Sequence, residues 1–105
     1  MVTKEFKEFE TATLPCSENN NSKNVQWEYR NLIAGSKYGI IYYPNGQMKP
    51  GYADRFSVNT TSAANNALVI RPVKITDAGL YKCTTDDGFG IATITSLSVP
   101  AAGSI

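Results

Sequence analysis

Cysteine and histidine limit most strongly what chemistry this 105-residue chain could carry, because it has two cysteines, Cys16 and Cys83, and no histidine. A structural zinc site needs four ligands of these types, and a histidine-based acyl-transfer triad needs an imidazole base. Neither can be assembled from this chain alone. No nucleophile with a base beside it is recognisable either. We therefore expect no catalytic residue, no metal site, no cofactor and no enzyme.

An adjacent carboxylate pair, Asp86-Asp87, is the remaining candidate for ligand chemistry. It could hold calcium or a cationic ligand weakly, but a solvated turn whose carboxylates bond to nearby backbone is the simpler interpretation. The glycine-containing run at 88–91 follows it. This run is no phosphate cradle, because no helix comes after it to offer its N-terminal amides to an anion.

Charge and composition indicate the class of protein. Ten Lys and Arg against nine Asp and Glu give a formal net charge of +1, so we expect no nucleic-acid partner and no overall attraction to an anionic membrane surface. Hydrophobic residues make up 42% of the chain, which is enough for a packed core. Ten Thr, nine Asn and six Tyr favour strands joined by Asn-rich turns. A single all-β domain is predicted.

Alternation of apolar and polar residues recurs in short stretches that are separated by turn residues. One stretch puts Val25, Trp27 and Tyr29 on one face, and Glu28 and Arg30 on the other. Beyond a single turn around 74–77, no helical period is sustained. About seven to nine short strands favour a β-sandwich over a single sheet. The predicted strands cover 11–16, 25–30, 38–43, 55–58, 67–70, 79–85 and 89–99.

Three features predict local irregularities in these strands. Pro15 cannot donate a ladder hydrogen bond, so its strand should lie at a sheet edge or a bulge at that point. Gly39, inside a strand, indicates a bulge. Asn45-Gly46 tolerates the positive φ angles of a type I′ turn, and it predicts a hairpin with a short edge strand behind it.

Two motifs resemble a known family. Cys16 and Trp27 are followed by Asp-x-Gly-x-Tyr-x-Cys at 77–83, which ends at Cys83. Arg55-Phe56-Ser57-Val58 resembles the fourth-strand motif of a variable-type domain. Together they resemble an immunoglobulin domain of the variable type (V-set), over about residues 11–99. The fold that this implies is an immunoglobulin-like two-sheet β-sandwich with V-set Greek-key topology.

The resemblance implies a role for each matched residue. Cys16 and Cys83 would form a disulfide between the two sheets, and Trp27 would pack on it. Tyr81 would make a tyrosine corner, with its hydroxyl bonded to the backbone just upstream. Arg55 and Asp77 would form an ion pair that closes one end of the sandwich. The alternative for the cysteines is two buried free thiols, as in an intracellular domain.

The end of the chain departs from antigen-receptor V domains. Ala92 stands where Phe-Gly-x-Gly-Thr would have its second glycine, and Leu97-Ser98-Val99 arrives two residues late. Only residues 84–88 separate Cys83 from Phe89, which makes a very short third hypervariable-like loop. The chain therefore resembles non-rearranging immune-type or adhesion receptors, with an intermediate between the V-set and the I-set as the alternative.

V-set domains commonly pair through the outer side of the sheet that would contain 25–30, 38–43, 79–85 and 89–99, which we call the GFCC′ face. Alternation along these strands predicts an amphipathic outward patch, whose residue types are enriched at protein interfaces. The alternative is that these are single exposed apolar residues of the kind found on most protein surfaces. The expected partner-binding residues are Glu28, Arg30, Ile40, Tyr42, Lys82, Thr84 and Phe89.

These features predict an extracellular binding module that contacts a protein ligand or a second copy of itself, in which case it would form a homodimer. Asn20 and Asn59 begin glycosylation sequons, and both are expected to lie off the GFCC′ face. One alternative is a lectin-like domain that binds polysaccharide through Tyr43, Tyr52 and Phe89. Another is a structural domain in a tandem array of an intracellular scaffold.

No secretory leader or membrane-spanning run is recognisable, so we expect a mature fragment of a cell-surface or secreted protein, attached to a membrane only through a segment outside it. Residues 1–100 are expected to form the domain, and residues 101–105 to begin a linker or tail. A free-standing cytosolic domain is the alternative.

Overall fold

The computed structural model describes residues 2–16, 25–60, 66–85 and 92–102. In these ranges it is all β except for one turn of 3₁₀ helix, η1 (Ile75–Asp77), at the place where the sequence allows a single helical turn. Within the described residues, no helix has the length and apolar character that a membrane crossing requires. The strands are β1 (Val2–Glu5), β2 (Ala12–Leu14), β3 (Val25–Arg30), β4 (Gly39–Tyr42), β5 (Phe56–Asn59), β6 (Ala67–Ile70), β7 (Gly79–Thr85) and β8 (Ala92–Ser98).

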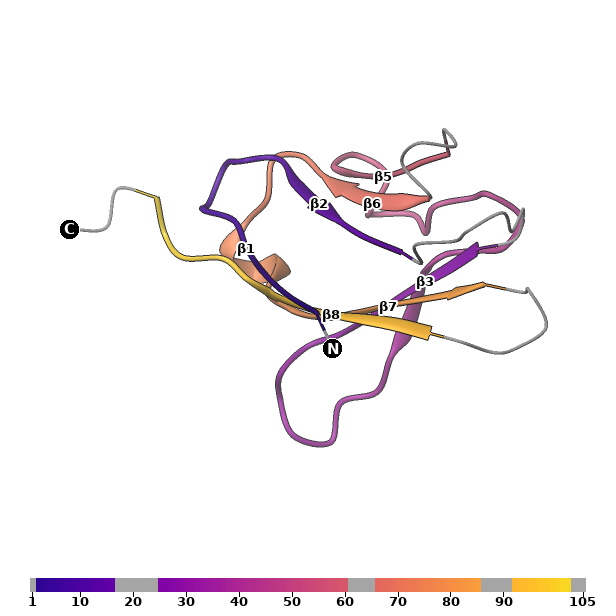
Figure 1. The fold of residues 1–105 in the computed structure, drawn as a ribbon, viewed down its shortest axis with the longest axis horizontal. Helices are drawn as coiled ribbons and strands as arrows, with labels where there is room; N and C mark the ends of the chain where they lie inside the picture. Colours follow the sequence, from indigo (N-terminus) through magenta and orange to yellow (C-terminus); the bar gives the residue numbers. More distant parts are fainter. Residues whose placement is uncertain (1, 17–24, 61–65, 86–91, 103–105) are drawn as a thin grey trace.

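The predicted two-sheet sandwich is confirmed. A five-stranded sheet has the order β1-β8-β7-β3-β4, and a three-stranded sheet with the order β2-β6-β5 lies over it as a second layer (Figure 1). β3, β6 and β7 begin and end where alternation predicts. β1 was not predicted; it pairs in parallel with β8, from Val2 opposite Thr95 to Glu5 opposite Ser98. β2 lies at a sheet edge and ends at Leu14, which agrees with the expectation for Pro15.

The core lies between the sheets and is built around a disulfide. Cys16 and Cys83 are bonded, with their Cα atoms 5.5 Å apart, so the free-thiol alternative is wrong. In the chain-entropy model, a link across 67 residues stabilises the fold by about 4 kcal/mol. The largest fully buried side chains around it include Trp27, Tyr81, Leu14, Ile41, Leu68, Ile70 and Leu97.

The bulge predicted at Gly39 lies two residues further along β4. Trp27 is opposite Tyr42, and Glu28 is opposite Ile40, which leaves Ile41 as the extra residue. The bulge interrupts alternation, so that Ile41 is buried and Tyr42 also packs against the core cluster. The prediction that Tyr42 points outward on the GFCC′ face is therefore wrong, because a register shift between strands cannot be seen in one strand's sequence.

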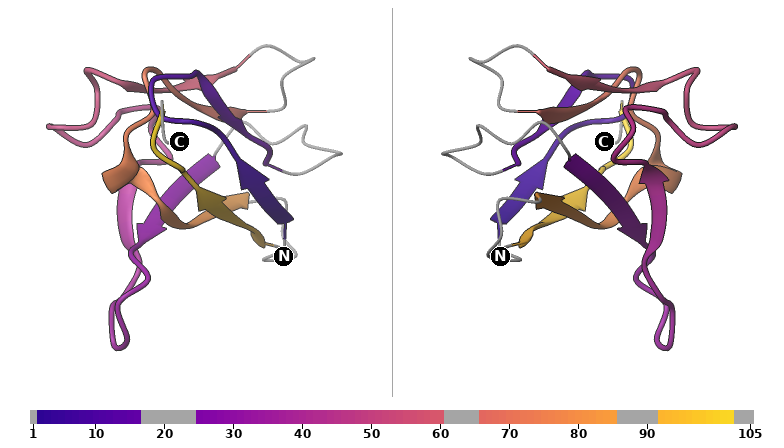
Figure 2. Two further views of the ribbon diagram at one scale, coloured as in Figure 1. Left: turned by 90° about the vertical axis from the view of Figure 1, so that its left-hand side faces the viewer. Right: turned by 90° about the vertical axis from the view of Figure 1, so that its right-hand side faces the viewer.

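Two loops flank β4. The hairpin after it forms, and the Tyr43 amide donates to the Gln47 carbonyl at 2.9 Å, but the predicted type I′ turn is wrong. Gly46 has a φ of 89° whereas Asn45 has no positive φ, and the Gly46 amide donates to the Tyr43 carbonyl at 2.9 Å, so the turn begins one residue earlier, at Pro44. The edge strand expected behind this hairpin is reduced to an isolated bridge between Tyr42 and Met48. The loop at 31–38, between β3 and β4, projects away from both sheets (Figure 2).

Candidate binding face and the cavity beside it

An ion pair joins the residue just before β5 to η1, the turn before β7. The Nη1 and Nη2 atoms of Arg55 donate to Oδ2 and Oδ1 of Asp77 at 2.7 and 2.9 Å. Asp77 is buried, and its Oδ2 also accepts the Lys74 amide at 2.7 Å. The hydrogen bond to Asp77 raises the pKa of Arg55 above its ordinary value. Both oxygens of the Asp77 carboxylate thus accept hydrogen bonds from the protein itself, so we assign it no ligand.

The tyrosine next to this pair has the expected corner geometry. The Tyr81 hydroxyl donates to the carbonyl oxygen of Asp77 at 2.6 Å, and its ring centroid lies 4.9 Å from that of Tyr29. Tyr29 in turn donates to the Ala78 carbonyl at 2.8 Å. Burial, reinforced by the Asp77 carboxylate, raises the pKa of Tyr81 far above its usual value. These contacts hold the start of β7 in place for the strands of the GFCC′ face.

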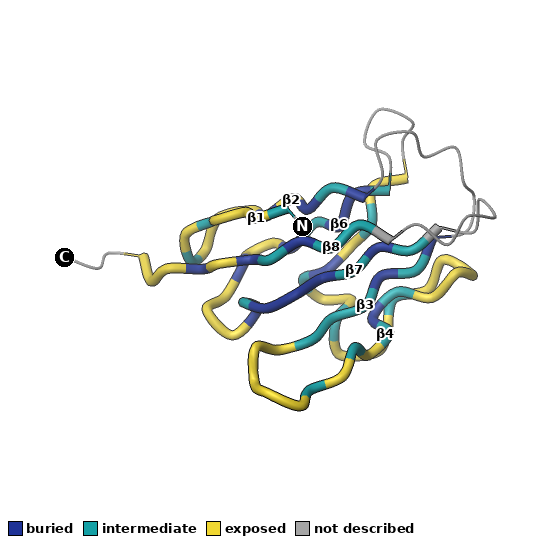
Figure 3. The backbone as a smooth tube through the Cα atoms, turned by 60° about the horizontal axis from the view of Figure 1, so that its bottom comes forward, coloured by how far each residue is buried: buried dark blue, intermediate teal, exposed yellow. Residues whose placement is uncertain are grey.

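The GFCC′ face is the outer side of β8, β7, β3 and β4, which lie side by side in Figure 3. Pairing places Glu28 opposite Lys82 and Lys82 opposite Ile94, and the next outward row joins Arg30, Leu80 and Ser96. The neighbouring inward residues are buried, as alternation predicts, except Tyr29, which is half-buried. Five of the seven expected partner-binding residues are half-buried positions of this face, namely Glu28, Arg30, Ile40, Lys82 and Thr84.

Polar contacts within the face hold its charges in place. Glu28 Oε1 accepts Nε2 of Gln26 at 3.1 Å and lies 3.7 Å from Nζ of Lys82. The same Nζ lies 4.5 Å from the centre of the Tyr38 ring, and Cζ of Arg30 lies 5.6 Å from that centre. Two cations therefore share one aromatic ring, and one of them is also paired with a carboxylate. A partner would meet a preorganised surface.

Three residues of this face were missed by sequence reasoning. Leu80 and Ile94 lie in its central rows, and Tyr38 contacts both cations. Leu80 is only 9% exposed, yet it is absent from the core cluster between the sheets. The signal for Leu80 was available, because it stands two residues before Lys82 in a strand that alternates. The same signal was available for Tyr38, which stands two residues before Ile40 in the stretch 38–43 that was predicted as a strand, although in the structure it precedes β4.

Several predicted site residues do not belong to this face. Phe89, Asn20 and the Asp86-Asp87 pair lie outside the described residues. Asn59 is exposed at the end of β5, on the other sheet. In the described ranges, no group of three or more Cys, Asp or Glu side chains is placed to hold a metal ion.

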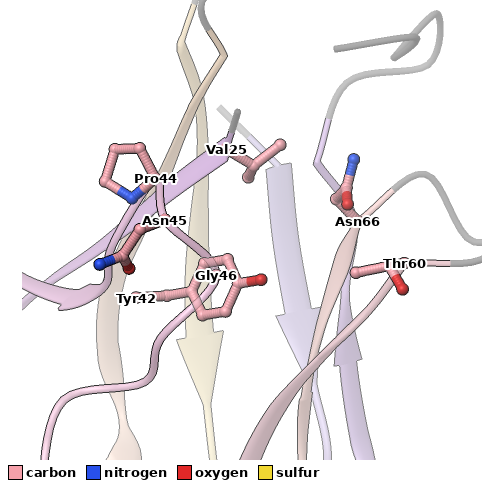
Figure 4. Close-up of a pocket in the computed structure, with 7 residues that line it drawn as sticks. All are labelled: Val25, Tyr42, Pro44, Asn45, Gly46, Thr60 and Asn66. Atoms are coloured by element: carbon pink, nitrogen blue, oxygen red, sulfur yellow. The ribbon is translucent and has the colours of Figure 1, made fainter. Parts of the chain in front are cut away.

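A cavity of about 360 Å³ opens beside β4, between the hairpin and the three-stranded sheet. Figure 4 shows the Tyr42 ring in it, with its hydroxyl pointing toward Thr60 and Asn66. No charged residue is among those that line it. Of the aromatics expected for a lectin, Tyr43 is 39% exposed, whereas Tyr52 packs edge-on against Phe56 with a centroid distance of 5.1 Å. The lining residues are Val25, Tyr42, Pro44, Asn45, Gly46, Thr60 and Asn66.

Comparison with known proteins agrees with this architecture. A family model described as the immunoglobulin V-set domain matches residues 5–99, which is most of the chain. No curated protein was found to match the sequence. The sheet order, the Cys16–Cys83 disulfide, the Trp27 ring buried in the core and the tyrosine corner are features of the same architecture. The chain belongs to the immunoglobulin V-set family.

Proposed function

We propose that this V-set domain is a recognition module that binds a protein, either a heterologous ligand or a second copy of itself, through the GFCC′ face. The observation that carries the proposal is the composition of that face. Ile40 on β4 and Ile94 on β8 supply apolar surface on either side of β3 and β7, and Tyr38 and Arg30 are of the types that dominate interface energies. Neighbouring charges are already paired, which lowers the cost of covering them.

Glycosylation and the disulfide are consistent with this role in an extracellular setting. Asn59 lies at the end of β5, so a glycan attached there would extend from the three-stranded sheet and leave the GFCC′ face uncovered. The Cys16–Cys83 bond favours an oxidising compartment, such as the cell surface or the secreted space, over a reducing cytosol. We propose no nucleic-acid partner and no cofactor. A structural role in a tandem array is the less favoured alternative.

Sedimentation equilibrium of the domain with matched variants tests self-association. Ile40→Asp places a charge on the GFCC′ face, whereas Val69→Asp changes a half-buried aliphatic residue on the outer side of the other sheet. We expect Ile40→Asp to weaken association at least tenfold, equivalent to about 1.4 kcal/mol, and Val69→Asp to leave it unchanged. Equal effects of the two substitutions would reject pairing through this face.

A photo-crosslinking amino acid at Lys82 tests for a heterologous ligand on intact cells. The same label at Ser57, which is exposed on β5, is the control. Discrete protein adducts from position 82 that are absent from position 57 support the proposal. If the domain did not self-associate and the adduct patterns from positions 82 and 57 were identical, the proposed protein binding through the GFCC′ face would be overturned.

A second candidate function is binding of a neutral saccharide, and the cavity beside β4 favours it. Within the described ranges, the side chains of Tyr42, Thr60 and Asn66 have no hydrogen-bond partner, and no charge lies among them. An aromatic ring with uncharged donors and acceptors suits a sugar ring and its hydroxyls. Chemical shifts of Tyr42 and Asn66 should move on titration with uncharged mono- and disaccharides; shifts that stay constant up to millimolar sugar would reject this candidate.

A further inference from the structure

The loop at 31–38 presents two adjacent aliphatic side chains to solvent. Leu32 is 65% exposed and Ile33 is 70% exposed, which makes them two of the most exposed large hydrophobic residues in the described chain. The loop extends beyond the body of the sandwich in Figures 1 and 2, so its end can reach a surface that the sheets do not touch. We call residues 32 and 33 the apolar tip.

Hydrogen bonds inside the loop hold the apolar tip in this position. Oδ1 of Asn31 accepts the amide of Ile33 at 3.0 Å and also accepts the Ser36 hydroxyl. The Ser36 amide donates to the Ile33 carbonyl at 3.1 Å, which closes the turn. The loop is therefore built to expose the two side chains, and little conformational entropy is lost when something covers them.

The charged residues next to the apolar tip in the sequence are of one sign. Although the whole chain has a net charge of only +1, it has no Asp or Glu anywhere from residue 29 to residue 53. That stretch contains Arg30, Lys37 and Lys49, and Lys37 is exposed within the loop itself. Tyr38, a residue type common at membrane interfaces, ends the same loop. The stretch 29–53 is therefore positively charged, although the net charge of the whole chain is too small to attract an anionic surface.

We propose that the apolar tip inserts into the interfacial layer of a bilayer that contains anionic lipids, while the exposed Lys37 meets the headgroups. A short apolar projection backed by cations suits a lipid interface, where side chains enter about 5–10 Å below the headgroups. A protein partner would favour a broader apolar surface, as the GFCC′ face supplies. This contact goes beyond the protein binding proposed above and does not depend on it.

Vesicle co-sedimentation tests the proposal, with vesicles of phosphatidylcholine alone and of phosphatidylcholine with about one third phosphatidylserine. Leu32→Ser/Ile33→Ser removes the tip but keeps the backbone amide that Asn31 accepts. Phe9→Ser is the matched control, because Phe9 is 67% exposed elsewhere in the fold. Thermal unfolding of each variant checks that it remains folded.

We expect the wild-type domain and Phe9→Ser to bind the anionic vesicles equally, and the double serine variant to bind them at least tenfold more weakly. Lys37→Ser should lose about fivefold, which corresponds to about 1 kcal/mol for one cation at an anionic surface, and added salt should erase that difference. Wild-type protein that fails to sediment with anionic vesicles overturns the proposal, as does a double variant that binds like the wild type. If the double serine variant lost crosslinks to a protein on cells but still bound anionic vesicles, the apolar tip would be a protein contact, and this result too would overturn the proposal.

Discussion

The indole nitrogen of Trp27 donates a hydrogen bond of 3.1 Å to the carbonyl oxygen of Asn66, a residue 39 positions further along the chain. Trp27 lies on β3 of the five-stranded sheet and is fully buried, whereas Asn66 immediately precedes β6 of the three-stranded sheet. Asn66 has a φ of 59°, a left-handed conformation that asparagine tolerates better than most residues. The bond therefore joins the two layers at the point where the chain enters β6, in addition to the disulfide.

Trp27→Phe should destabilise the domain by about 1–3 kcal/mol, because the Asn66 carbonyl loses its donor and the smaller ring leaves space in the core. Urea unfolding, followed by far-ultraviolet circular dichroism because the variant has no tryptophan, measures this change. A free energy of unfolding equal to that of the wild type would show that the bond contributes nothing.

Gly79→Ala should destabilise by at least about 2 kcal/mol, because Gly79 has a φ of 150° and a Cβ there would lie 2.7 Å from the Arg30 carbonyl oxygen. Gly39→Ala is the control, since the space around Gly39 is open and its φ is not in the left-handed region. Thermal unfolding of the two variants should separate them clearly. Equal midpoints would contradict the close approach of β7 to β3.

Arg55 and Asp77 should show a coupling free energy of about 1–3 kcal/mol in a double-mutant cycle of Arg55→Met and Asp77→Ala. The aspartate variant should be the less stable of the two, because it also loses the acceptor of the Lys74 amide. Glu28 and Lys82, whose Oε1 and Nζ atoms are 3.7 Å apart, provide the control cycle, with an expected coupling below about 1 kcal/mol. Equal couplings would show that burial of Asp77 adds nothing.

Stability should fall as the pH rises above about 10, because the pKa of Tyr81 is raised by burial in the folded state and is ordinary in the unfolded state. Below pH 10 both states keep the proton; above it, only the unfolded state releases it, at a cost of about 1.4 kcal/mol per pH unit. Burial raises the pKa of Tyr29 in the same direction.

Tyr81→Phe tests this dependence in urea titrations at several pH values. At neutral pH the variant should be less stable by about 1–3 kcal/mol, because it loses the bond to the Asp77 carbonyl. Above pH 10 the difference should shrink, because phenylalanine has no proton to lose. A constant difference from neutral to alkaline pH would contradict this account.

The sequence predicted correctly those features that depend on residues close together in the chain. Val25, Trp27 and Tyr29 alternate with Glu28 and Arg30 on a single strand, so burial on one side could be predicted without knowledge of the partner strand. β1 lacked that signal, since it is mostly exposed and carries Lys4 and Glu5; its place beside β8 depends on a strand more than ninety positions away.

The amino-acid sequence by itself determined the class of fold, the Cys16–Cys83 pairing implied by the family motifs, and most of the outward rows of the GFCC′ face, because period-two burial and motif spacing are properties of the chain itself. Only the tertiary structure decided that Tyr42 turns toward the core at the Ile41 bulge and that Leu32 and Ile33 stand clear of the sheets. Both outcomes depend on register and on loop path. Register depends on which strands pair, and the loop path depends on the space that the packed layers leave. Neither can be read from the residue at a single position.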